Sequence, residues 1–83
     1  MSYEKVKQAE NISIGTKQTT KMVELGKATE VFVAKDADPR ITAKIVNLCK
    51  KMGVQVTYVD SMKQLGKACG IEVGAAMVAA VNE

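Results

Sequence analysis

The stretch EVFVAKDADPRITAKIVNLCKKMGVQVTYV, residues 30–59, decides the fold class. Its two ends, residues 30–34 and 54–59, are rich in β-branched side chains, and the second alternates between apolar and polar residues, as half-buried strands do. Between them, Asp38 is a good helix cap and Pro39 suits a first helical position, where its missing N–H costs nothing. The stretch therefore predicts a strand, a helix that begins at Pro39, and a second strand.

The helix within this stretch carries apolar residues at helical spacing on one side, namely Ile41, Ile45, Leu48 and Met52. This spacing predicts that the four side chains face the core. Gly53 is expected to end the helix, because glycine adopts the left-handed conformation that often follows a last turn.

Further elements are predicted on both sides of this stretch. They are a helix over 2–10 with Ser2 as a possible cap, a strand over 11–14, a helix over 16–25 ended by Gly26, and a helix opened by Asp60 and Ser61 that ends near Gly70. Periodicity alone leaves the apolar tail, residues 70–81, as a strand or a helix, and it is most useful as a buried strand. Strands and helices alternate throughout, which predicts an α/β domain with helices on both faces of a central sheet.

Length and composition limit the kind of protein. The 83 residues make a single domain, 1–83, with one core. A net charge of +3 favours an anionic partner, and the lack of histidine removes the commonest general base and metal ligand. We therefore expect no catalytic residues, no metal and no cofactor.

The chain also predicts its compartment. It has no apolar run of the roughly 20 residues that a membrane-spanning helix needs, and the charged start, MSYEKVKQAE, lacks the apolar centre of a signal peptide. Cys49 and Cys69 lie far apart in apolar surroundings, which is more typical of reduced, packed thiols than of the alternative, a single disulfide. These features indicate a cytoplasmic protein with no membrane partner.

The first candidate site is GTKQTTK, residues 15–21, at the start of a predicted helix. A helix start favours acids, yet this one carries Lys17, Lys21 and the neutral Gln18. An anion bound there would gain from the free N–H groups and both ammonium groups, and the amide of Gln18 could read a base edge. The alternative is a solvated helix start with incidental lysines.

The second candidate is GIEVG, residues 70–74, where Ile71 and Val73 lie between two glycines. In a loop, these side chains could pack against an unstacked RNA base. The alternative is that both belong to the core.

The third candidate is AKDADP, residues 34–39. Asp38 has a sufficient role as a helix cap and Asp36 suits a turn, so a metal site or a catalytic carboxylate pair has little support. Lys35 directly follows a strand, at the edge where α/β proteins bind ligands. Because Gly15 lies at a comparable strand-to-helix junction, the two are expected to converge on one surface.

Three motifs, GTKQTTK, VAKDADP (33–39) and LGKACGIEVGAA (65–76), resemble the family of ribosomal proteins that bind kink-turn RNA, and most closely its short bacterial YbxF-type members. The resemblance covers nearly the whole chain. It implies a three-layer α-β-α sandwich with a mixed four-stranded sheet. Archaeal and eukaryotic members usually have Asn-Glu where this chain has Lys17-Gln18.

The resemblance also implies how RNA is bound. The helix start after the first strand would enter the groove at tandem sheared G·A pairs, and the apolar loop would cover bases of the bulge. Carried over, the RNA-binding residues are Gly15, Thr16, Lys17, Gln18, Lys21, Lys35, Asp36, Ile71, Glu72 and Val73.

These observations together predict a non-enzymatic, monomeric protein that binds structured RNA, such as kink-turns in rRNA or mRNA leaders, and not DNA. Two alternatives stay open. One is a constitutive protein of the large ribosomal subunit that binds rRNA by its shape. The other is a small enzyme that binds a nucleotide at Gly15, although the sequence lacks GxGxxG and P-loop motifs.

Overall fold

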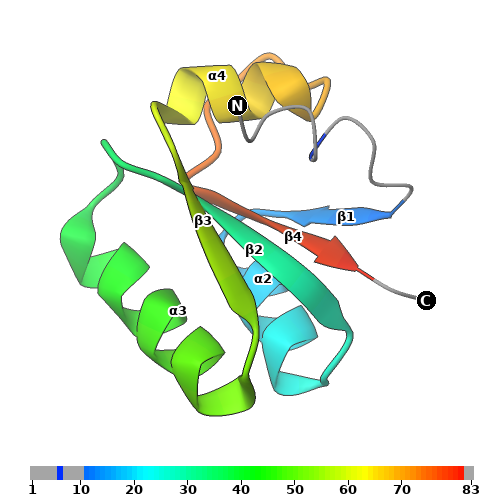
Figure 1. The fold of residues 1–83 in the computed structure, drawn as a ribbon. Helices are drawn as coiled ribbons and strands as arrows, with labels where there is room; N and C mark the ends of the chain where they lie inside the picture. Colours follow the sequence, from blue (N-terminus) through cyan, green and yellow to red (C-terminus); the bar gives the residue numbers. More distant parts are fainter. Residues whose placement is uncertain (1–5, 7–10, 82–83) are drawn as a thin grey trace.

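The computed structural model describes residue 6 and residues 11–81, in which strands and helices alternate (Figure 1). Their order is β1 (Ile12–Ile14), α2 (Thr16–Glu24), β2 (Ala28–Ala34), α3 (Pro39–Met52), β3 (Gln55–Val59), α4 (Met62–Ala68) and β4 (Met77–Val81). Each element predicted within residues 11–70 is confirmed in type, and the tail ends as a strand. The helix predicted over 2–10 lies outside the described residues, except for Val6, which is helical and buried.

The four strands form one mixed sheet in the order β1-β4-β2-β3. β4 is antiparallel to both of its neighbours, whereas β2 and β3 are parallel, with Phe32 opposite Thr57. The chain therefore places its last strand in the interior of the sheet, between the first and second strands. The mixed four-stranded sheet implied by the family resemblance is confirmed.

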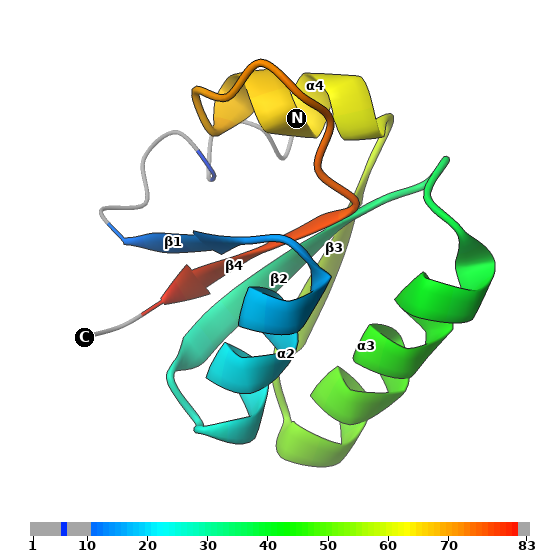
Figure 2. The same cartoon turned by 180° about the vertical axis from the view of Figure 1, so that it is seen from behind.

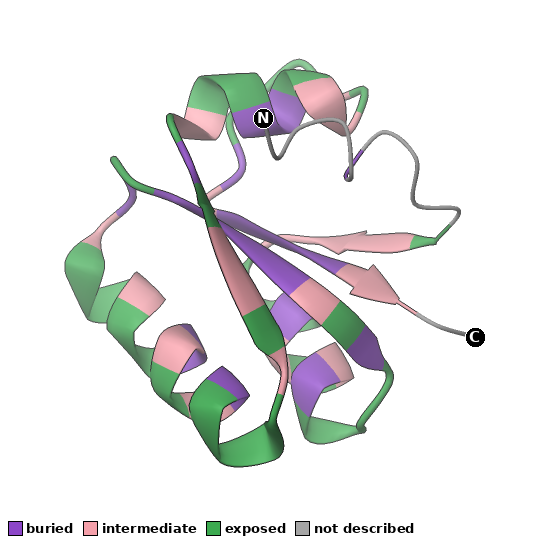
Figure 3. Ribbon diagram, viewed as in Figure 1, coloured by how far each residue is buried: buried purple, intermediate pink, exposed green. Residues whose placement is uncertain are grey.

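Helices cover both faces of this sheet, which gives three layers (Figures 1 and 2). Residues of β2 alternate between two core clusters: Phe32 packs in the first cluster with Leu65 of α4, and Val31 packs in the second with Ile45 of α3. Figure 3 shows the buried residues along the central strands and on the helix sides that face them. The predicted three-layer sandwich is confirmed.

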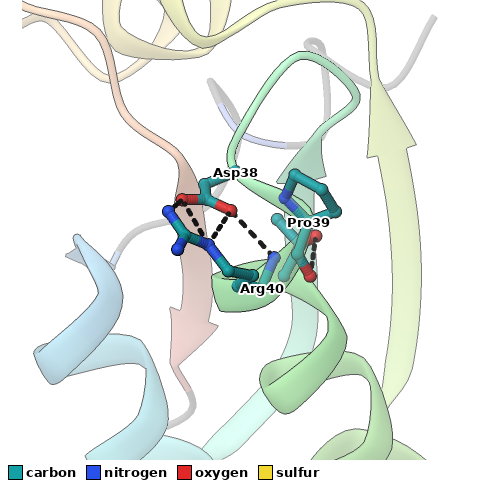
Figure 4. Close-up of polar contacts among 4 residues, drawn as sticks. Asp38, Pro39 and Arg40 are labelled. Carbon is teal, nitrogen blue, oxygen red and sulfur yellow. Dashed lines mark hydrogen bonds and ion pairs between the residues drawn. The ribbon is translucent and has the colours of Figure 1, made fainter.

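Local signals fix the ends of α3 as predicted. Asp38 precedes the helix, and its Oδ1 accepts a hydrogen bond from the Arg40 N–H at 2.9 Å (Figure 4). The Arg40 guanidinium donates to the same carboxylate, with Nη2 2.8 Å from Oδ2, and this bond lowers the pKa of Asp38 and raises that of Arg40. Gly53 ends the helix in the left-handed conformation, at φ 73°.

The apolar stripe predicted on α3 is only partly correct. Ile45 and Cys49 are the buried residues of the helix, while Ile41 and Met52 at its two ends are 37 % and 43 % exposed. The core therefore takes the middle turns of the helix. Residue spacing alone cannot tell how much of a helix overlies the sheet.

The two cysteines are free thiols on opposite sides of the sheet. Cys49 is buried in the second core cluster, and Cys69 is half-buried against the first. Burial raises the pKa of both thiols. In addition, none of the helices among the described residues has the length and apolar character required to cross a bilayer.

Candidate nucleic-acid interface

Three predicted segments meet at one end of the sheet because β4 starts between the ends of β1 and β2. The N–H of Gly15 donates to the carbonyl of Met77 at 3.0 Å, and the N–H of Ala34 donates to the carbonyl of Ala76 at 3.0 Å. Figure 2 shows the chain entering α2, leaving β2 and entering β4 at this end. The predicted convergence of the two strand-to-helix junctions is confirmed.

The start of α2 is open to solvent. Gly15 has φ 98° and lacks a side chain with which to cap the helix, and a Cβ there would meet no atom within 4 Å. The positive φ therefore requires glycine at this position, while the space beside it is empty. Thr16, Lys17 and Gln18 follow as exposed residues, and the first helical turn contains no acid.

Thr19 attaches the opposite side of this helix to the strand before it, and Thr20 bonds within the helix. Thr19 is fully buried and its hydroxyl lies 3.4 Å from the carbonyl of Ser13, to which it donates. The hydroxyl of Thr20 donates to the carbonyl of Thr16 at 2.8 Å. With Thr19 fixed toward the core, the exposed side chains of Lys17, Gln18 and Lys21 are left on the surface.

The turn after β2 carries Lys35 and Asp36, both exposed. The N–H of Lys35 donates to the carbonyl of Val59 at 2.9 Å, so the turn is attached to the end of β3. Asp36 also has a structural partner, because its Oδ1 accepts from the N–H of Met62 at 2.8 Å. Lys35 is thus an available cation, whereas one oxygen of Asp36 is already engaged.

The two apolar residues of the loop between α4 and β4 differ in burial, although the sequence predicts the same role for both. Val73 is 71 % exposed, and Glu72 beside it is also exposed. Ile71 is half-buried and packs against the first core cluster. The core alternative therefore applies in part to Ile71, and Val73 is the apolar side chain that this loop offers to a ligand.

Two cations at this end of the molecule were not singled out from the sequence. Arg40 lies in the first turn of α3, and its charge is paired with Asp38. Lys63 is exposed in the first turn of α4, next to the residue that contacts Asp36. The position of Lys63, two residues after the cap Ser61, was the signal that could have found it, because helix starts follow strands at this edge.

Known proteins resemble this chain in sequence and in structure. Residues 2–83 match the model of the ribosomal protein L7Ae/L30e/S12e/Gadd45 family. An RNA-binding protein of Bacillus pumilus and the RNA-binding protein YbxF of Geobacillus stearothermophilus are each 60 % identical over 79 residues, which cover 95 % of this chain and 96 % of each relative. The 15.5kD RNA binding protein of Giardia lamblia superposes with a TM-score of 0.86 at 28 % identity, over 98 % of this chain and 68 % of its own.

The fold and its open helix start therefore define an α/β protein of the L7Ae class. The chain belongs to the ribosomal protein L7Ae/L30e/S12e/Gadd45 family, and its close relatives are of the YbxF type. This confirms the resemblance drawn from GTKQTTK, VAKDADP and LGKACGIEVGAA.

Proposed function

We propose that this protein binds RNA without catalysing a reaction, and that it stabilises kink-turns, in which a bulge between two helices is flanked by sheared G·A pairs. Relatives that are 60 % identical carry the name RNA-binding protein. The observation on which the proposal chiefly depends is the convergence at the start of β4. Hydrogen bonds from Gly15 and Ala34 to the consecutive carbonyls of Met77 and Ala76 put the α2 start and the Lys35 turn on either side of the start of β4, which directly follows the loop that carries Val73.

Each part of this surface suits a different part of such an RNA. The uncapped start of α2 favours phosphate groups through its free N–H groups, its dipole and the charge of Lys17, and the exposed Lys21 four residues later adds a second charge on the same helix. Gln18 offers a neighbouring donor and acceptor, which can read a base edge. Val73, which is 71 % exposed, can pack on the face of an extruded base.

The surface has little that would serve an enzyme. Asp36 and Asp38, the acids considered as a carboxylate pair, bond to different partners, Met62 and Arg40. We infer that the protein acts by binding alone. A free cytoplasmic monomer and a ribosome-associated protein would use the same surface.

Equilibrium binding to three probes tests the proposal. The probes are a kink-turn duplex, a straight duplex of the same length, and a mononucleotide. We expect preference for the kinked duplex by at least tenfold and negligible binding of the mononucleotide. Equal affinity for kinked and straight duplexes would leave only charge-driven binding, and tight binding of the mononucleotide would favour the enzyme alternative.

A substitution at Gln18 tests the recognition of the base edge. Gln18→Ala should cost about 1–3 kcal/mol of binding to the kinked duplex and little on the straight one. Gln55→Ala, in an exposed glutamine at the other end of the sheet, is the matched control and should change neither affinity. Equal losses on both duplexes for Gln18→Ala would contradict the assignment.

A further inference from the structure

The turn after β2 and the start of α4 are joined by a side chain across 26 residues of sequence. The carboxylate of Asp36 accepts from the N–H of Met62, the first residue of α4, at 2.8 Å. The turn that carries Asp36 is itself fixed to the sheet, because Lys35 donates to the carbonyl of Val59 and Ala37 donates to that of Ala34 at 3.2 Å. Through Asp36, the start of α4 is therefore attached to a turn that is itself bonded to the sheet.

Met62 also forms a hydrogen bond with the loop before β4. Its carbonyl accepts from the N–H of Ala75 at 3.0 Å. A Cβ added to Gly74 would lie only 3.2 Å from the Cβ of Met62, so the loop backbone lies directly against this residue. One residue of α4 thus bonds to the turn through its N–H and to the loop through its carbonyl.

The loop is also fixed one turn further along α4. Ile71 donates to the carbonyl of Gly66 at 3.0 Å, and a Cβ added at Gly66 would lie 2.0 Å from the carbonyl oxygen of Val73. Gly66 is helical, so it is needed for space and not for a special backbone conformation. Residues 62–75, named here the α4–loop unit, are therefore joined to one another by these contacts, and the side chain of Asp36 links this unit to the turn.

From these contacts we propose that Asp36 is a positioning residue: through the N–H of Met62, it sets where the α4–loop unit presents Val73 relative to the start of α2. This inference rests on the proposed RNA-binding function. It explains why a carboxylate is present beside a surface where phosphates are expected, since its charge alone would repel RNA. In place of the RNA contact that the family resemblance implied for Asp36, we assign it this structural partner.

Two substitutions separate the charge of Asp36 from its role as an acceptor. Asp36→Asn and Asp36→Ala remove the same negative charge, but only asparagine keeps an oxygen that can accept from Met62. The probes are a kink-turn duplex and the same duplex with an abasic site at the extruded nucleotide. Wild type should prefer the intact base by about fivefold or more, as expected for a packed base.

We expect Asp36→Asn to keep this preference and Asp36→Ala to lose most of it, with equal salt dependence for both variants. Hydrogen exchange at the amide of Met62 should be faster in Asp36→Ala only, and melting curves must show that both variants are folded. Equal preference in the two variants, or unchanged exchange at Met62, would overturn the inference alone. A wild type that does not distinguish the abasic duplex would overturn the proposed role of Val73, and the positioning role with it.

Discussion

Ile71 and Val73 are two apolar residues of one short loop that differ in how deeply they are buried. Both are β-branched, and both lie between Gly70 and Gly74. Ile71 packs against the first core cluster, whereas Val73 is 71 % exposed although its backbone is pressed against α4. An exposed apolar side chain on a fixed backbone is well suited to contact a base, because little conformational freedom is lost on binding.

Truncation should therefore separate the two residues. Ile71→Ala should lower the free energy of unfolding by roughly 1–3 kcal/mol, while Val73→Ala should change it by less than about 0.5 kcal/mol. On kink-turn RNA, Val73→Ala should lose about 1 kcal/mol of affinity. Chemical denaturation and equilibrium binding measure the two quantities.

Leu25→Ala is the matched control for this pair. Leu25 is also an exposed apolar residue, at 55 %, but it lies at the far end of α2. Leu25→Ala should leave RNA affinity unchanged, and it should change the free energy of unfolding by less than about 0.5 kcal/mol. Unchanged RNA affinity in Val73→Ala would mean that the side chain of Val73 does not contribute to RNA binding.

At the scale of the element, the two ends of α2 differ in how they are capped. Its start has no acid and no side-chain cap, whereas Gly26 follows its last turn in the left-handed conformation at φ 73°, as an ordinary helix stop. Ser or Asp caps stabilise many helix starts through a side-chain hydrogen bond, but the positive φ of Gly15 disfavours such a residue here, so this start lacks a cap. Lys17 in the first turn is consistent with a phosphate backbone as the partner of this end, and Lys21 lies four residues further along, in the last turn of the helix.

The salt dependence of binding tests this interpretation. Lys17→Ala, Lys21→Ala and Lys35→Ala should each reduce the slope of log affinity against log salt by roughly one unit, because each lysine neutralises one phosphate. Lys51→Ala, in an exposed lysine of the last turn of α3, is the control and should leave the slope unchanged. If only Lys51→Ala altered the slope, the RNA would lie at the opposite end of the molecule.

The elements themselves could be predicted because their signals are local. Asp38 caps the helix that starts one residue later, and Gly53 ends the same helix at φ 73°. The partner of Asp36 could not be predicted in this way, since Met62 lies 26 residues away and meets it only in the folded sheet. The unequal burial of Ile71 and Val73 likewise depends on how closely the loop approaches Gly66.

At the scale of the whole molecule, the sheet separates the two core clusters; Cys49 belongs to the second, and Cys69 packs against the first. Cys49 belongs to the side covered by α2 and α3, and Cys69 packs on the side covered by α4. Cys69 is half-buried and Cys49 is fully buried, so Cys69 is the less protected of the two thiols. The two cysteines therefore report separately on the two layers.

Alkylation by iodoacetamide should thus modify Cys69 faster than Cys49, whose side chain is fully buried.

Burial raises the pKa of both thiols above the ordinary value of 9.0, so the folded state disfavours the thiolate. Their contribution to stability is complete below that value and is lost as the pH rises through it, when the unfolded chain ionises first. Denaturation at pH 7 and pH 10 measures this loss of stability, and mass spectrometry of the alkylated peptides measures the labelling rates of the two thiols. Equal labelling rates would indicate that the two layers open together.

The interior position of β4 has a consequence for the order in which this protein can be made. A ribosome releases the chain from its N-terminal side, so β1 and β2 emerge long before the strand that joins them through Gly15 and Ala34. Until residues 77–81 have left the exit tunnel, the start of α2 and the Lys35 turn have no common support. If the proposed surface is the RNA site, RNA binding is therefore expected to begin only once residues 77–81 are free to pair with β1 and β2.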